Sequence, residues 1–123
     1  MGETPLMHSF DPVAVAHTRE PFDFHEFAPF NERAFAVFRG DGVEASEWEI
    51  HRDTDEFLFV LAGSVTVEIL TDDASEEIDL VAGQFAVVPR GHWHRHRDIV
   101  DLVEMYFTPG GSEQSDAEDP RLP

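Results

Sequence analysis

The sequence contains no cysteine and no lysine among its 123 residues. The lack of cysteine excludes disulfide bonds and thiolate metal sites, so a metal ion would depend on imidazole and carboxylate ligands. It is also compatible with a reducing cytosol. No apolar run approaches the roughly 20 residues that a transmembrane helix needs, and residues 1–10 lack the basic start and apolar core of a signal peptide. We therefore expect a soluble, cytoplasmic protein.

Basic residues are scarce, because eight arginines stand against 26 aspartate and glutamate residues and leave a formal net charge of −18. Binding to nucleic acid or to an anionic membrane needs Lys and Arg, so this balance argues against both partners. A solvated acidic surface explains the charge most simply. Adaptation to high salt is the alternative, and the absence of lysine fits that origin or a GC-rich genome equally well.

What is present is sufficient for one globular domain, with 41% hydrophobic residues and 11 phenylalanines. Short runs of β type repeat from residue 34 onward, and in residues 64–70 the apolar Val65, Val67 and Ile69 alternate with the polar Thr66 and Glu68. The predicted strands are residues 34–39, 43–52, 56–62, 64–70, 78–81, 85–88 and 99–107, with turns at 40–42 and 63–64. Short strands at such regular spacing predict an all-β domain, either a sandwich or a barrel.

Two flanking segments lack this pattern. Residues 1–30 form an arm with four phenylalanines between Pro21 and Phe30, preceded by a predicted helical turn that starts at Pro12. Because the arm cannot form a core alone, we expect it to pack on the barrel of residues 31–109 or on a partner subunit. Residues 110–123 are polar and acidic without an apolar anchor, which predicts a disordered tail.

Strand geometry brings metal-capable residues together. Glu49 and His51 are two residues apart, so in a strand both side chains point to the same face. Glu56 begins the next predicted strand, and we expect residues 53–55 to fold that strand back antiparallel, close to His51. His94 arrives from a separate Pro/Gly turn. If the shared face is the inside of a barrel, the four groups can close on one divalent ion.

Mixed imidazole and carboxylate ligation suits Mn, Fe, Ni, Zn or Co. A metal-free site is the alternative, in which two facing carboxylates in a cavity of low dielectric would raise a pKa or draw in an arginine. His92 and His96 flank His94 at two-residue spacing. One of them could act as a further ligand, although a role at the rim or in hydrogen bonding is more common for such neighbours.

The second of two motifs carries a family resemblance. Gly83 is followed after five residues by Pro89-Arg-Gly91 and after two more by His94. This spacing resembles the second motif of the cupin superfamily, G-x5-P-x-G-x2-H-x3-N, with Asp98 where asparagine is usual. The match is strict through His94.

The first motif of that superfamily, H-x-H-x3–4-E-x6-G, is also similar to this chain. His51, Glu56 and Gly63 stand at its second histidine, its glutamate and its glycine, whereas Glu49 occupies the place of the first histidine. The resemblance extends over about residues 31–109, and its context is similar to small single-domain cupins of the mannose-6-phosphate-isomerase-like type.

The resemblance implies an antiparallel jelly-roll barrel and a homodimer. It also implies that His51, Glu56 and His94 are metal ligands, with Glu49 at a fourth ligand position. A carboxylate there would shift the preference toward harder ions such as Mn or Fe, or would mark a site that has lost its metal.

Two classes of function follow. The first is a metal-dependent enzyme that acts on a small polar metabolite, and the second is a non-catalytic cupin that binds a metal ion or small molecule. The catalytic residues are unassigned, since there is no cysteine and no G-x-S-x-G elbow. Strand phase alone does not decide whether three further side chains face the cavity: Glu68, Glu104 and Tyr106. Three arginines could bind a substrate carboxylate, with neutralisation of nearby acids as the alternative: Arg90, Arg95 and Arg97.

Overall fold

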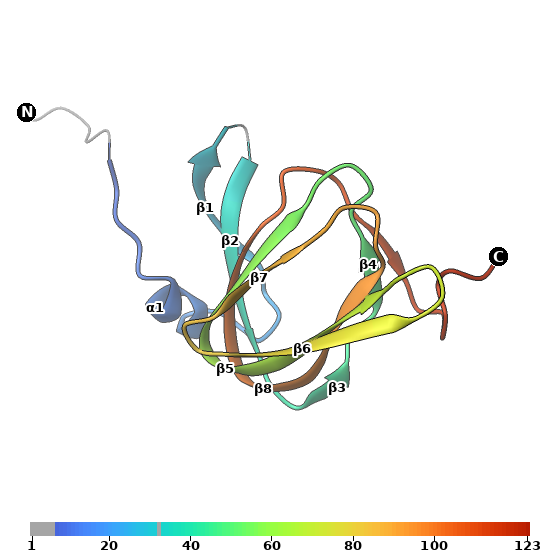
Figure 1. The fold of residues 1–123 in the computed structure, drawn as a ribbon. Helices are drawn as coiled ribbons and strands as arrows, with labels where there is room; N and C mark the ends of the chain where they lie inside the picture. Colours follow the sequence, from blue (N-terminus) through green and yellow to red (C-terminus); the bar gives the residue numbers. More distant parts are fainter. Residues whose placement is uncertain (1–6, 32) are drawn as a thin grey trace, which may run out of the picture.

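The computed structural model describes residues 7–31 and 33–123, so the first six residues of the predicted arm lie outside the described residues (Figure 1). One short helix, α1 (Pro12–His17), precedes the strands. The strands are β1 (His25–Phe30), β2 (Arg33–Gly40), β3 (Val43–Ala45), β4 (Trp48–Ile50), β5 (Glu56–Leu70), β6 (Ser75–Val81), β7 (Phe85–Val88), β8 (His94–Phe107) and β9 (Glu113–Ser115).

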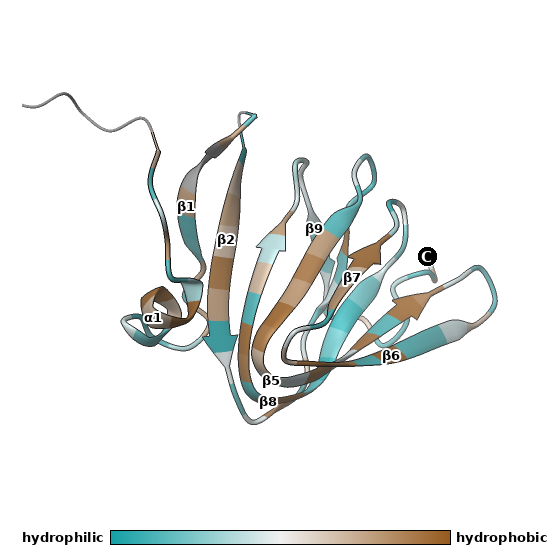
Figure 2. Cartoon of the chain, turned by 60° about the vertical axis from the view of Figure 1, so that its left-hand side comes forward, coloured by the Kyte–Doolittle hydropathy of each residue, from teal (hydrophilic) through white to brown (hydrophobic). Residues whose placement is uncertain are grey.

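All strand pairs in the described chain are antiparallel, and they form one curled sheet. The path β1-β2-β8-β4-β9 runs through the sheet, β3 also pairs with β8, and β5 pairs with β6, β7 and β8. Hydrophobic stretches concentrate in the strands, whereas the loops are mostly hydrophilic (Figure 2). The all-β fold class predicted from the alternating pattern is therefore confirmed, as is the antiparallel arrangement that the family resemblance implies.

β5 and β8 are the two long strands on which the sheet is built, and each bends sharply. The sequence predicts a turn at residues 63–64, but β5 continues through them to Leu70, so that prediction is wrong. Gly63 has φ +72°, and a Cβ there would lie 2.2 Å from the carbonyl oxygen of Asp101 on β8. Glycine is therefore needed for a close backbone approach at the bend, where the pairing register with β8 shifts.

The predicted strand of residues 43–52 is divided into β3 and β4, and both lie along β8. The expected hairpin between β4 and β5 is wrong, because the start of β5 pairs with β7 and Glu56 lies opposite Val88. Alternation identifies the face on which a side chain lies, but it does not identify the neighbouring strand.

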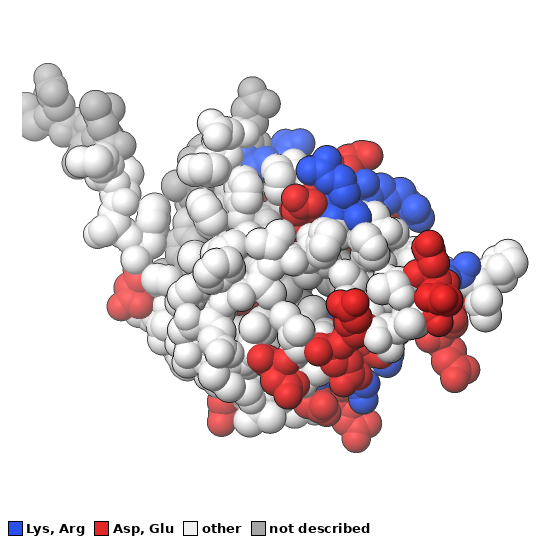
Figure 3. Space-filling view, in the orientation of Figure 1, with Lys and Arg blue, Asp and Glu red and all other residues white. Residues whose placement is uncertain are grey.

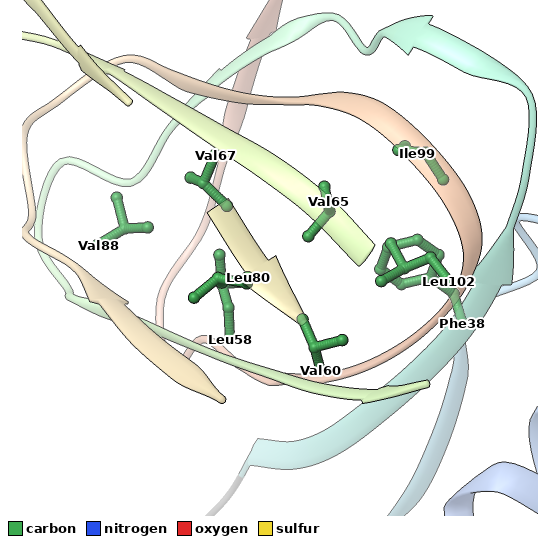
Figure 4. Close-up of a cluster of buried hydrophobic side chains, with 9 residues drawn as sticks. All are labelled: Phe38, Leu58, Val60, Val65, Val67, Leu80, Val88, Ile99 and Leu102. Atoms are coloured by element: carbon green, nitrogen blue, oxygen red, sulfur yellow. The ribbon is translucent and has the colours of Figure 1, made fainter. Parts of the chain in front are cut away.

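The core lies inside the curled sheet, where nine buried side chains from the five strands β2, β5, β6, β7 and β8 pack together (Figure 4). They are Phe38, Leu58, Val60, Val65, Val67, Leu80, Val88, Ile99 and Leu102. A smaller cluster on the outside joins α1 to the sheet through Ala16, Val37 and Val103. The helix begins as predicted, with Pro12 first and the Asp11 side chain accepting a hydrogen bond from the Ala14 backbone N–H at 3.1 Å.

Both flanking segments contact the sheet. In the arm, β1 pairs with β2 of the same chain, with His25 opposite Val37. In the tail, β9 pairs with β4, with Gln114 opposite Glu49. A disordered tail over residues 110–123 stays a prediction; within this segment, β9 attaches to β4 through backbone pairing and through the Gln114 side chain.

Candidate metal centre

Three neighbouring segments bring the four predicted ligands to one end of the interior. Glu49 on β4 lies opposite His94, the first residue of β8. His51 follows directly after β4, and Glu56 is the first residue of β5. One ligand atom from each of the four residues can be chosen so that all lie within 4.8 Å of one another. The structure thus brings together the whole set that strand phase and motif spacing selected.

The four side chains contact one another directly. His51 Nε2 lies 2.9 Å from Glu49 Oε1 and 3.2 Å from Glu56 Oε2. His94 Nε2 lies 3.1 Å from Glu56 Oε1 and 3.6 Å from Glu49 Oε1. Glu49 keeps 33% of its side chain exposed, whereas the other three are buried. The cluster is therefore open to solvent on the side of Glu49.

Backbone carbonyls orient both imidazoles. Nδ1 of His51 lies 3.2 Å from the carbonyl oxygen of Gly111, and Nδ1 of His94 lies 3.2 Å from that of His92. Because a carbonyl oxygen can only accept, each Nδ1 carries a proton and each Nε2 faces the two carboxylates. This is the orientation in which a histidine offers Nε2 to a metal ion.

Two further side chains hold the carboxylates. The Thr108 hydroxyl donates a hydrogen bond to Glu56 Oε2 at 2.5 Å, and Gln114 Nε2 donates to Glu49 Oε2 at 3.0 Å. Such partners fix the direction in which a ligand points. Sequence reasoning missed both residues, since each follows the last predicted strand and neither belongs to a recognisable motif.

The histidines bind protons tightly in this cluster. Burial alone would lower the pKa of His51, but hydrogen bonds to Glu49 and Glu56 outweigh it and raise the pKa to about 10. Burial also opposes protonation of His94, and the same two carboxylates raise its pKa to about 9. At neutral pH the metal-free cluster therefore holds two imidazolium groups against two carboxylates.

The carboxylates respond in the opposite direction. Burial alone would raise the pKa of Glu56, but hydrogen bonds from His51 and His94 lower it to about 2. The pKa of Glu49 is likewise lowered, against burial, by His51, His94 and Gln114. The expectation that a metal-free site would raise a carboxylate pKa or admit an arginine is wrong, because the two histidines neutralise the carboxylates themselves.

A family comparison agrees with this geometry. The family model described as "Cupin domain" matches residues 37–107, which is more than half of the chain. The chain belongs to the cupin family. The match includes all four clustered residues. No curated protein matches the sequence.

Solved structures similar to this cupin share its fold at low sequence identity. A hydroquinone 1,2-dioxygenase solved with Cd²⁺ and 4-hydroxybenzonitrile has a TM-score of 0.67 and 19% identity, covering 89% of this chain and 82% of that chain. A cupin-2 domain protein from Shewanella frigidimarina has a TM-score of 0.61 and 23% identity, covering 84% and 90%. An oxalate oxidase has a TM-score of 0.60 and 19% identity, covering 74% and 52%.

The cluster of this cupin opens into a cavity of about 800 Å³. Its lining comes from the sheet interior, the arm and the start of the tail. The lining residues are Phe22, Phe24, Phe38, Ser46, Glu47, Glu49, His51, Glu56, Leu58, His94, Arg95, His96, Glu104, Tyr106, Thr108, Gly110, Ser112 and Gln114. A volume of this size suits a small-molecule ligand.

Neither neighbouring histidine joins the cluster. Nδ1 of His92 hydrogen-bonds to the carbonyl oxygen of Arg90 at 2.9 Å within its own turn. His96 Nε2 donates instead to both carboxylate oxygens of Glu104, each at 2.9 Å. The His96–Glu104 pair lines the cavity, and sequence reasoning left Glu104 undecided because strand phase alone did not separate the inner from the outer face.

The three arginines in the second cupin motif, which spans residues 83–98, pair with acidic residues. Arg90 lies 3.3 Å from Asp55, Arg95 lies 2.8 Å from Glu68, and Arg97 lies 2.6 Å from Glu77. Arg95 also stacks over the ring of Trp48, 4.2 Å from its centroid. Neutralisation of nearby acids, one of the two roles considered for these residues, accounts for all three.

Proposed function

We propose that this cupin holds one divalent transition metal ion on Glu49, His51, Glu56 and His94, and that it is an enzyme acting on a small polar metabolite. The convergence of four ligand atoms within 4.8 Å, at the end of a cavity, carries the proposal. Two imidazoles and two carboxylates suit Mn, Fe, Ni, Zn or Co. The similar dioxygenase and oxalate oxidase are enzymes by name, and the dioxygenase was solved with a divalent cation.

The side chains fit an ion of this kind. Both Nε2 atoms already point at the carboxylates, and the backbone carbonyls keep the protons on Nδ1. When bound, the ion supplies Lewis-acid polarisation or activation of water or dioxygen. Thr108 and Gln114 hold Glu56 and Glu49 in place, and Glu49 lies on the open side, where substrate enters.

The second candidate is a non-catalytic cupin that binds a metal ion or a small molecule, including a version without metal. The charges within the cluster favour this candidate. Two protonated histidines balance two carboxylates, so the cluster is neutral without a divalent ion. Binding and storage then require only the cavity, with no reaction.

Metal content is the first test, because it separates a metal-containing protein from the metal-free version of the second candidate. The full chain is purified without chelator, and bound metal is measured by inductively coupled plasma mass spectrometry. We expect about one ion per chain in the wild type, and a loss in His94→Ala. Glu49→Gln tests whether Glu49, which stands in place of the first histidine of the usual cupin motif, is a ligand. Glu47→Gln removes a carboxylate that lines the same cavity outside the cluster, and it should retain full metal content.

Turnover is the second step. The metal-loaded wild type and His94→Ala are incubated with pools of small polar metabolites, and consumption is followed by NMR. Consumption by the wild type alone supports the enzyme. A metal-free wild type would contradict the enzyme proposal, and equal consumption by both proteins would place any reaction outside this site.

We further propose a cytoplasmic homodimer. The outer face of β5 and β7 presents Phe57, Phe59, Phe85 and Val87, of which Phe85 is 59% and Val87 54% exposed. Figure 3 shows an uncharged central area in the view of Figure 1, with acidic side chains below it and to its right and basic side chains above it. Burial of such apolar surface supports self-association. Among the described residues, no helix has the length and hydropathy that a membrane crossing requires.

Light scattering at several concentrations tests the dimer with the wild type and Phe85→Ser. A dimer that dissociates in the variant supports this face as the interface. A truncated chain that starts at Asn31 tests the arm separately, and an unchanged oligomeric state would remove the arm from the interface. Cell fractionation tests the location.

A further inference from the structure

Part of the cavity lining is aromatic. Phe22 and Phe24 from the arm, Phe38 from β2 and Tyr106 from β8 line it together. The Phe24 ring lies 5.0 Å from Phe38 and 6.0 Å from Tyr106, nearly perpendicular to the tyrosine. These rings form a continuous wall, which we call the aromatic wall, and the proposed metal chemistry makes no use of it.

The two arm residues of this wall leave much of their apolar surface uncovered. Phe38 is 5% exposed, whereas Phe22 is 38% and Phe24 55% exposed. Since both line the cavity, part of that surface faces its interior and its mouth. A ligand that covers these rings removes apolar area from water, which is favourable.

The chain positions Phe22 at a conformational cost. Its φ is +61°, a value that is unusual for a bulky residue. Its backbone N–H donates to the carbonyl oxygen of Arg39 at 2.8 Å. Gly40 leaves room for the ring, because a Cβ at that position would lie 2.4 Å from two Phe22 ring atoms. The arm is thus fixed against the rim of the cavity by a strained backbone and a matched glycine.

Two polar groups lie beside the aromatic wall. The His96 ring is 6.0 Å from the Phe38 ring, and its Nε2 is occupied by Glu104. Within the described chain, neither His96 Nδ1 nor the Tyr106 hydroxyl makes a hydrogen bond. Neither atom is among the buried polar atoms that lack a partner, so both are accessible from the cavity that their residues line. Both atoms are therefore available to a ligand in the cavity.

The availability of His96 and Tyr106 specifies the polar group of that ligand. A hydroxyl both donates and accepts hydrogen bonds, so it satisfies Nδ1 of His96 whether or not that nitrogen carries a proton. The same hydroxyl, or a second one, can accept a hydrogen bond from Tyr106. A carboxylate is less suitable, because the Glu104 carboxylate already lines the cavity against the same His96 ring and would repel it.

We propose that the aromatic wall binds the ring of a small phenolic molecule, with its hydroxyl hydrogen-bonded to His96 and Tyr106. Aromatic rings attract one another in tilted and edge-to-face arrangements beyond the effect of buried area, so a planar ring fits this wall better than a saturated one. An apolar cavity of about 150 Å³ accommodates benzene, and this cavity of about 800 Å³ leaves room for substituents that reach the metal cluster. As a substrate subsite this inference rests on the proposed function, although binding alone does not.

Phenol and cyclohexanol are matched probes, because they share a hydroxyl and a six-membered ring and differ in aromaticity. Binding is titrated by saturation-transfer NMR on the full-length Zn²⁺-loaded chain and on the metal-free chain. We expect phenol to bind about tenfold more tightly than cyclohexanol. Equal affinity for the two probes would overturn the proposal.

Three variants locate the site. Phe24→Leu keeps an apolar side chain without a ring, and it should remove most of the preference for phenol. Tyr106→Phe should weaken phenol severalfold and leave toluene unchanged. Phe85→Ala, on the outer face and outside the cavity lining, should bind phenol as the wild type does. If Phe24→Leu prefers phenol over cyclohexanol as strongly as the wild type does, phenol binds elsewhere and the proposal is overturned.

The metal content of wild-type protein purified without chelator separates this inference from the proposed function. Selective phenol binding without stoichiometric metal in the chelator-free preparation would support the aromatic subsite and contradict the metal enzyme. Stoichiometric metal with no preference for phenol would leave the metal proposal standing and overturn the subsite.

Discussion

Gln114 donates a hydrogen bond from Nε2 to Oε2 of Glu49 at 3.0 Å. The two residues also lie opposite each other where β9 pairs with β4. A residue of the predicted disordered tail therefore holds the cluster residue that departs from the usual cupin motif. Glu49 is the most exposed of the four, and apart from the two histidines of the cluster its side-chain partner among the described residues is Gln114.

Replacement of Gln114 by alanine should weaken metal binding without unfolding the chain. Partners of metal ligands contribute about 10- to 100-fold in affinity, and an exposed side chain should be near the lower end. Competition with a chromophoric chelator measures the affinity of Mn²⁺ or Zn²⁺. Glu118→Ala removes an exposed side chain of the same tail and serves as the control. Equal affinities for both variants would contradict a positioning role for Gln114.

The sequence predicted the four-residue cluster because two independent constraints selected it. Strand alternation placed Glu49 beside His51, and motif spacing added Glu56 and His94. The direct neighbours of the cluster were not predictable in this way. Gln114 contacts it from a segment without periodicity, and pairing between β9 and β4 depends on backbone groups that every residue carries.

The fold class was predictable from alternation, but the strand connections were not. Gly63 in an alternating run indicates a break in the strand, and a tight turn is the usual interpretation. In the structure β5 instead bends against Asp101, which is 38 positions further along the sequence. Contacts at such separation leave no local signal.

The bend at Gly63 gives a stability prediction. Gly63→Ala should lower the free energy of unfolding by more than about 3 kcal/mol, because its Cβ would meet the Asp101 carbonyl at 2.2 Å in a left-handed conformation. Gly42→Ala is the matched control, since Gly42 has φ +68° with open space around it and should cost only about 1–2 kcal/mol. Urea denaturation of both variants measures the difference, and equal losses would argue against the close approach.

The ionised cluster should also shape the pH dependence of metal-free stability. The pKa of His51 is raised from 6.5 to about 10, so its contribution is complete below 6.5 and is lost as pH rises through 10. The pKa of Glu56 is lowered from 4.5 to about 2, so its contribution is complete above 4.5 and is lost as pH falls through 2. Both contributions are complete between pH 4.5 and 6.5.

Urea denaturation of the chelator-treated wild type from pH 3 to pH 10 measures this profile. Glu56→Gln with His51→Gln removes both titrations and should flatten the part of the profile that they produce. Since general repulsion among the many carboxylates remains in the double variant, the difference between the two curves isolates the cluster. A difference that is constant with pH would contradict the ion pairs.

Metal binding should release protons, because His51 and His94 each give up the Nε2 proton to become ligands. Their pKa values of about 10 and 9 keep both imidazoles protonated at pH 7 in the metal-free cluster. A divalent ion then replaces two protons, and the charge of the cluster stays constant. The apparent affinity should therefore rise by up to about 100-fold for each pH unit until pH approaches 9.

Isothermal titration calorimetry with Mn²⁺ at pH 6, 7 and 8 measures this slope. Repeating the pH 7 titration in two buffers with different enthalpies of ionisation gives the number of protons released, which we expect to be about two. His92→Gln removes a histidine that lies next to the cluster but outside it, so the proton count should not change. An affinity independent of pH between 6 and 8 would show that Mn²⁺ binds without displacing these protons, and it would exclude His51 and His94 as the ligands.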